Sequence, residues 1–119
     1  MRQVVVTGLG VVSSIGNQTS AVLTALRESC SGIEFLPEMR DLGFRCQVGG
    51  RIKDLDTGRI PKRALLTMSD VARFAAVAAL EAIADAKLPL EALRSERAAV
   101  VVGTSFGGVG EAFRAEQLL

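Results

Sequence analysis

The amino-acid sequence predicts an α/β fold. Residues 3–7 and 98–103 are rich in β-branched side chains and show no polar–apolar alternation, which is typical of strands buried on both faces of a sheet. Residues 69–86 form a helical pattern that is apolar on nearly every side, as expected of a helix buried in a larger body. Strand and helix patterns alternate along the chain, and this order favours an α/β architecture with some parallel pairing.

The first half of the chain predicts a helix and, after it, a second strand. Residues 19–29 have helical periodicity, with Asn17 or Thr19 as the cap. Residues 34–43 favour an irregular or briefly helical segment, and residues 44–52 a strand weakened by two adjacent glycines. The apolar stripe of the helix consists of Val22, Leu23, Ala25 and Leu26.

The second half opens with a polar loop. This loop contains a turn at residues 56–58 and one expected helical turn after Pro61. The helix over residues 69–86 begins at Ser69 or Asp70, and its many alanines indicate that neighbouring backbones approach it closely.

The end of the chain predicts a third strand and a third helix. The strand at residues 98–103 leads through the glycine-rich stretch "GTSFGGVG" into a helix that begins near Gly110. This helical pattern runs to Leu118 and Leu119, an apolar end that needs a partner. We therefore expect that residues 1–119 are truncated at the C-terminus.

Composition narrows the class of protein. Of the 119 residues, 49% are hydrophobic, which allows a core, and the formal net charge is +1. That balance gives no support for nucleic-acid binding or for attraction to a membrane surface. The sequence has neither a secretory signal pattern nor an apolar run of the roughly 18 residues that cross a bilayer. We expect a cytoplasmic protein.

Residue counts also limit the chemistry. The chain contains no histidine, so a Ser-His-Asp site, a Cys-His site or a histidine-ligated metal site cannot be completed within it. Cys30 and Cys46 have neither redox nor zinc-site spacing, and we expect buried or half-buried thiols.

The stretch "TGLGVVSSIG", residues 7–16, resembles a dinucleotide-binding loop because it follows an apolar run. Gly8 and Gly10 match the first two positions of the G-x-G-x-x-G fingerprint, but Ser13 occupies the third. The next helix also begins too late for its N-terminus to face a phosphate bound there. We predict instead that the two glycines allow a tightly packed turn.

Four stretches resemble the β-ketoacyl-acyl-carrier-protein synthases, the condensing enzymes of fatty-acid and polyketide synthesis. They are "VVVTGLGVVSSIGN", "LRESCSGIEF", "MSDVARFAAVAALEAIADAKL" and "AAVVVGTSFGG", in the family's order and at nearly constant spacing. The resemblance covers essentially all 119 residues, and the motif "SSIGN" is more similar to type I than to type II synthases.

The resemblance implies a thiolase-like fold, of which residues 1–119 would be the N-terminal part of the first α/β half, a mixed sheet with buried helices. It implies a homodimer, or a heterodimer of a synthase with a chain-length factor, that works with acyl carrier protein and needs no cofactor or metal. A cysteine takes up the acyl group, and malonyl carrier protein loses carbon dioxide and attacks it, assisted by two histidines. These residues belong to segments beyond residue 119, so neither Cys30 nor Cys46 is the nucleophile and the isolated chain should be inactive.

Two clusters match functional positions of the family. Lys62 and Arg63, with Arg59 nearby, would dock the acidic carrier protein, although Leu66 stands where type I synthases often have another basic residue. The other interpretation is a solvated charged loop.

The second cluster follows the third predicted strand. Phe106 would line or gate the acyl-chain pocket, and Gly107 and Gly108 would permit a mobile loop. Phe106 as a core aromatic is the competing interpretation.

Three other functions remain open. A polyketide chain-length factor has the same scaffold but lacks the nucleophile. The residue at the downstream nucleophile position distinguishes such a factor from an active synthase. A stand-alone binding module predicts a stable, monodisperse chain of residues 1–119. A dinucleotide-binding module predicts binding of NAD.

Overall fold

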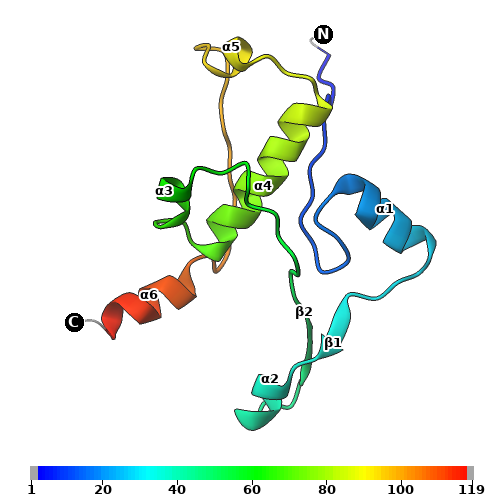
Figure 1. Ribbon diagram of the computed structural model, residues 1–119, viewed down its shortest axis with the longest axis vertical. Helices are drawn as coiled ribbons and strands as arrows, with labels where there is room; N and C mark the ends of the chain where they lie inside the picture. Colours follow the sequence, from blue (N-terminus) through cyan, green and yellow to red (C-terminus); the bar gives the residue numbers. More distant parts are fainter. Residues whose placement is uncertain (1–2, 118–119) are drawn as a thin grey trace.

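A computed structural model describes residues 3–117 of the chain. These residues form six helices and one two-stranded sheet (Figure 1), and these elements do not enclose a single compact core. In chain order the elements are α1 (Thr19–Arg27), β1 (Ile33–Phe35), α2 (Pro37–Asp41), β2 (Val48–Gly50), α3 (Lys62–Leu65), α4 (Asp70–Asp85), α5 (Leu90–Leu93) and α6 (Val109–Glu116).

The helices follow the local sequence signals. The helix predicted over residues 69–86 is confirmed as α4, and the Ser69 hydroxyl accepts a hydrogen bond from the Ala72 amide at 3.2 Å as its N-terminal cap. The helix predicted over residues 19–29 is confirmed as α1. It ends at Arg27, because Ser29 adopts the left-handed conformation with φ of 55°.

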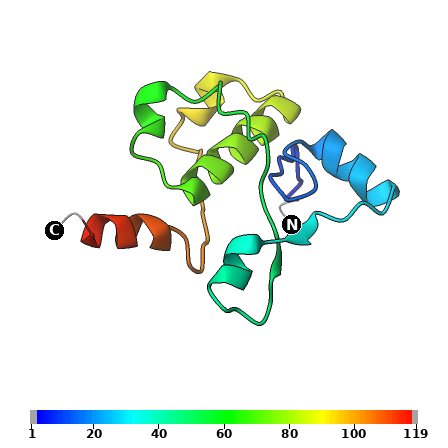
Figure 2. The same cartoon turned by 60° about the horizontal axis from the view of Figure 1, so that its bottom comes forward.

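The shorter predicted helices are confirmed as well. The helical turn expected after Pro61 is α3, and the helix expected near Gly110 is α6. Leu118 and Leu119, which the sequence pattern adds to this last helix, lie outside the described residues. In both views α6 extends away from the rest of the chain (Figures 1 and 2).

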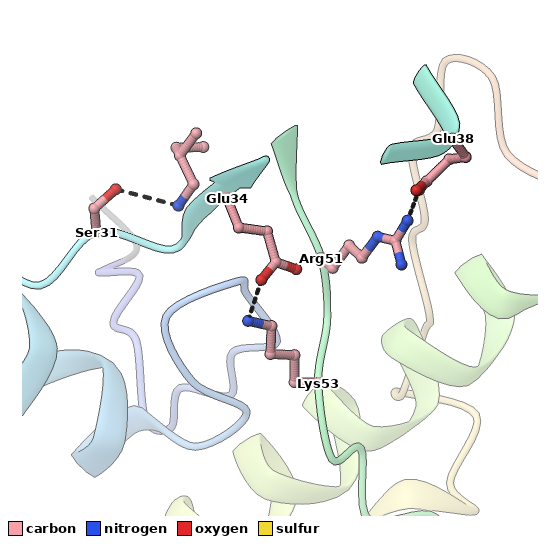
Figure 3. Close-up of polar contacts among 6 residues, drawn as sticks. Ser31, Glu34, Glu38, Arg51 and Lys53 are labelled. Atoms are coloured by element: carbon pink, nitrogen blue, oxygen red, sulfur yellow. Dashed lines mark hydrogen bonds and ion pairs between the residues drawn. The ribbon is translucent and has the colours of Figure 1, made fainter. Parts of the chain in front are cut away.

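The sheet is a small antiparallel hairpin. Ile33 pairs with Gly50 and Phe35 with Val48, so the strand predicted over residues 44–52 forms only at its centre, and β1 was not predicted. Two ion pairs join the segment after β2 to the segment that contains β1 and α2 (Figure 3). The Lys53 ammonium lies 2.5 Å from the Glu34 carboxylate of β1, and Arg51 pairs with Glu38 of α2.

The strands predicted at residues 3–7 and 98–103 do not form within the part of the chain that the structure describes. Neither segment is assigned to a strand, and Val5 and Val101 are 73% and 94% exposed. A β-strand needs a partner that accepts and donates its backbone hydrogen bonds, and neither segment has one. Helices with one small sheet are compatible with an α/β fold, but within residues 3–117 they include none of the expected parallel pairing.

Few side chains are fully buried. Ala25, Leu36 and Ile60 are the buried apolar residues among those described, and Ala25 is the one buried member of the predicted α1 stripe. The radius of gyration is 17.5 Å, against about 13.5 Å for a compact domain of this length. No residue of α4 is buried, which contradicts the prediction of a buried helix for this chain. None of the helices in the described residues is long and apolar enough to cross a membrane.

Candidate functional site

The glycine loop, residues 7–16, packs directly on α4. A Cβ atom built on Gly8 would lie 2.3 Å from the Ala82 carbonyl oxygen, and one built on Gly10 would lie 1.8 Å from the Ala78 carbonyl oxygen. Neither glycine has a positive φ, so glycine is needed here for close approach and not for its conformational freedom. The close packing predicted for Gly8 and Gly10 is confirmed, whereas the turn itself lies further along, where Ser13 and Gly16 exchange backbone hydrogen bonds.

A cavity of about 510 Å³ lies between the start of α1, the loop before α3, and α4. Its polar lining consists of Asn17, Gln18, Asp54, Asp56, Arg59 and Glu81. Arg59 is the one residue of the two predicted clusters that lines it. The cavity joins three segments that are distant in the sequence, and no local motif could have indicated it.

The basic residues differ in their surroundings. Lys62 and Arg63 stand exposed at the start of α3 and make no ion pair with any described residue. Arg59 donates a hydrogen bond from Nη1 to the Leu80 carbonyl of α4 at 3.3 Å. Two basic side chains are therefore free to meet an acidic partner, while the third is bound to the protein's own backbone.

Phe106 lies on an open loop and is 85% exposed, so within the described residues it is not a core aromatic. The Gly107 amide donates to the Thr104 hydroxyl at 3.2 Å, and Gly108 begins α6 with φ of 87°, a conformation that favours glycine.

Arg59 of the first cluster and Gly107 of the second contact different parts of α4. A Cβ on Gly107 would lie 3.2 Å from the Val71 side chain, near the first turn of α4, whereas Arg59 binds at Leu80. Val71 and Leu80 are nine positions apart on α4, about 13.5 Å along the axis.

The cysteine prediction is wrong. Cys30 and Cys46 are both exposed free thiols, because each lies in an open segment that nothing covers, one after α1 and the other before β2. In the described part of the chain, no group of three histidine, cysteine, aspartate or glutamate side chains could hold a metal ion.

The relation to known proteins is extensive. Residues 1–118 match the family described as "Beta-ketoacyl synthase, N-terminal domain". The chain belongs to the β-ketoacyl synthase family. This membership confirms the resemblance, and it implies a thiolase-like α/β fold for the domain.

The curated proteins that this chain is similar to include 3-oxoacyl-[acyl-carrier-protein] synthase 1 of Escherichia coli (strain K12), 43% identical over 108 residues, which are 91% of this chain and 27% of the relative. The enzyme of the same name from Haemophilus influenzae is 37% identical over 90% of this chain and 26% of its own length. A 3-oxoacyl-[acyl-carrier-protein] synthase 2 from Synechocystis sp. is 34% identical over 91% of this chain and 26% of its own length. The chain spans about a quarter of the length of these relatives.

Proposed function

We propose that residues 1–119 are the N-terminal portion of a 3-oxoacyl-[acyl-carrier-protein] synthase, within its β-ketoacyl synthase N-terminal domain. The observation that carries the proposal is the family match over residues 1–118, together with relatives that bear this enzyme name. The higher identity to a synthase 1, 43% against 34% to a synthase 2, favours the type I branch.

The surface of the chain supports a place within a larger fold. Its accessible area is 10083 Å², against roughly 6,200 Å² for a compact protein of this mass. Exposed apolar side chains, among them those of residues 4–6 and 100–102, contribute to this excess. In the mixed sheet that we propose, these segments are strands covered on both faces.

The proposed reaction joins an acyl thioester to the carbanion formed when malonyl carrier protein loses carbon dioxide. Its nucleophile and histidines lie outside this chain, which contains no histidine. Purified residues 1–119 should release no 3-oxoacyl product, while the full-length protein should form it from malonyl and acyl carrier protein. Condensation by residues 1–119 alone would contradict the assignment of the catalytic residues to segments outside this chain. An inactive full-length protein without a cysteine at the nucleophile position would favour the chain-length factor.

The proposed partner is acyl carrier protein, bound by a cytoplasmic homodimer. Lys62 and Arg63 are exposed and have no internal counter-ion among the described residues, so their charge is available to an acidic surface. Arg59 would lie at the edge of this docking surface, and Phe106, Gly107 and Gly108 would form the gate of the acyl pocket.

Charge reversal tests the docking surface. Lys62→Glu with Arg63→Glu in the full-length enzyme should raise the KM for carrier protein roughly tenfold and leave kcat unchanged. The matched control is Arg94→Glu with Arg97→Glu, two exposed residues whose reversal changes the net charge by the same amount. Equal KM values for the two double variants would refute specific docking.

A further inference from the structure

Two carboxylates of α4 bind backbone amides of a distant segment. The Leu9 amide donates to Asp85 Oδ2 at 3.0 Å, and the Val11 amide donates to Glu81 Oε2 at 2.9 Å. The second oxygen of the Glu81 carboxylate, Oε1, accepts from the Thr19 amide at 2.6 Å. Two acidic side chains thus hold three amides that lie more than 60 positions away in the sequence.

The spacing of the donors matches the spacing of the acceptors. In an extended chain, the amides of residues 9 and 11 point to the same side and lie about 6.8 Å apart. On a helix, residues 81 and 85 share one face and lie about 6 Å apart along the axis. Gly8 and Gly10 bring the two backbones close enough for these side chains to reach. The α4 carboxylates therefore occupy the amides that a neighbouring strand would otherwise bind.

Glu81 also completes the start of α1. The residue before α1, Gln18, makes no side-chain cap, and the first turn of this helix contains no acidic residue. A carboxylate that accepts from the first amides of a helix stabilises it, both by the hydrogen bond and by the helix dipole. Glu81 provides this carboxylate from another helix.

We propose that Glu81 and Asp85 are positioning residues that fix the glycine loop and the start of α1 on α4, and that Glu81 contributes more because it binds both segments. Glu81 is half-buried, whereas Asp85 is exposed, so solvent competes less with the hydrogen bonds of Glu81. This carboxylate clamp, Glu81 with Asp85, does not depend on the proposed enzymatic activity.

The charged surroundings of Glu81 come from two elements. Asp85 stands one turn further along α4, and the loop before α3 adds Asp54, Asp56 and Arg59 to the same cavity. The glycine loop and the start of α1 present only uncharged groups. Burial raises the pKa of Glu81, but the hydrogen bonds from Thr19 and Val11 outweigh it and hold the pKa below its ordinary value. The Glu81 carboxylate is therefore charged at neutral pH, and it is protonated only in acid, below its ordinary pKa.

Amide hydrogen exchange in the full-length protein tests the clamp. Glu81→Gln keeps the size of the side chain but leaves one acceptor oxygen for two amides. Hydrogen exchange of the Val11 or Thr19 amide should accelerate roughly tenfold or more. In the unmodified protein the protection of these amides should fall in acid, and in Glu81→Gln this pH dependence of the protection should disappear. Glu96→Gln, an exposed residue outside the clamp, is the matched control and should change neither amide. Equal exchange in the two variants would overturn the proposal.

Asp85→Asn gives an internal contrast, because one amide oxygen still accepts from Leu9. The exchange of Leu9 should increase less than that of Val11 or Thr19 in Glu81→Gln, and a larger increase would contradict the leading role of Glu81. If Glu81→Gln does not fold, amide exchange of the unmodified protein as the pH is lowered still tests the clamp. Acid should expose Val11 and Thr19 before the amides in the middle of α4, and simultaneous exposure would refute the clamp.

Discussion

Two glycine-rich loops of this chain follow the same sequence pattern and have opposite surroundings. Each follows three consecutive valines, residues 4–6 before the first loop and residues 100–102 before the second. In the first loop, residues 7–16, a Cβ on Gly10 would meet the backbone of α4 at 1.8 Å. In the second loop, residues 103–110, a Cβ on Gly103 would meet nothing within 4 Å.

The difference lies in the surface that faces each loop. Ala78, Ala82 and Ala86 are spaced four residues apart, so they form one small-residue face on which another backbone can lie. No described segment offers such a face to Gly103. A glycine after a valine run therefore has no fixed structural meaning, and the opposing residues decide whether it is needed.

Substitution at Gly10 is expected to give the largest effect. Gly10→Ala forces the loop away from the Ala78 carbonyl, because neither backbone can yield as a flexible side chain would. The free energy of unfolding should fall by about 3 kcal/mol or more, the upper range for overpacking. Urea denaturation of the full-length protein measures it.

Gly103→Ala is the matched control at the second loop. Gly103 has no positive φ and open space at its Cβ position, so the change should stay within about 0.5 kcal/mol. A cost equal to that of Gly10→Ala would remove the contrast between the loops and would indicate that another part of the protein covers the second one.

The second prediction concerns acid, which affects the first loop and the start of α1, the two segments that Glu81 holds. Because the folded pKa of Glu81 is lowered, its stabilising contribution is complete above the ordinary value of 4.5 and is lost as the pH falls below it. At pH 7 the free energy of unfolding of the unmodified protein should exceed that of Glu81→Gln by about 1–2 kcal/mol. Urea unfolding at a series of pH values should show this difference shrinking in acid, and a constant difference would contradict the assignment.

The smallest effect on stability is expected at Phe106. Its side chain is 85% exposed and contacts no core, so Phe106→Ala should change the free energy of unfolding by less than about 0.5 kcal/mol. If it gates the acyl pocket as proposed, the chain length of the products should shift in the full-length enzyme. An unchanged product distribution with unchanged stability would leave Phe106 outside the gate.

Local signals predicted the helices well. Ser69 caps α4 with its own hydroxyl, and Pro61 precedes the short α3, so each of these starts depends on residues within one helical turn. The packed glycine loop was also predictable, because the alanine pattern of α4 and the paired glycines both indicated close backbones.

Other features were beyond prediction from local sequence. The strand patterns at residues 3–7 and 98–103 describe how those segments would behave beside a partner, and no described residue is that partner. The cavity lined by Asn17, Asp56 and Glu81 joins three separate segments. Of the candidate site residues, Lys62, Arg63 and Phe106 are exposed, while Arg59 binds its own α4 backbone.

Motif order identified the family, Ser69 identified the start of α4, and the alanines of α4 with the paired glycines indicated where two backbones lie close. These properties depend on motif order and on neighbours within a turn or two. The tertiary structure alone decided that Glu81 accepts from Val11 and Thr19, because a hydrogen bond between residues 62 or 70 positions apart leaves no periodic trace in the chain. It also decided which glycine is covered, since Gly10 meets the backbone of α4 and Gly103 meets open space.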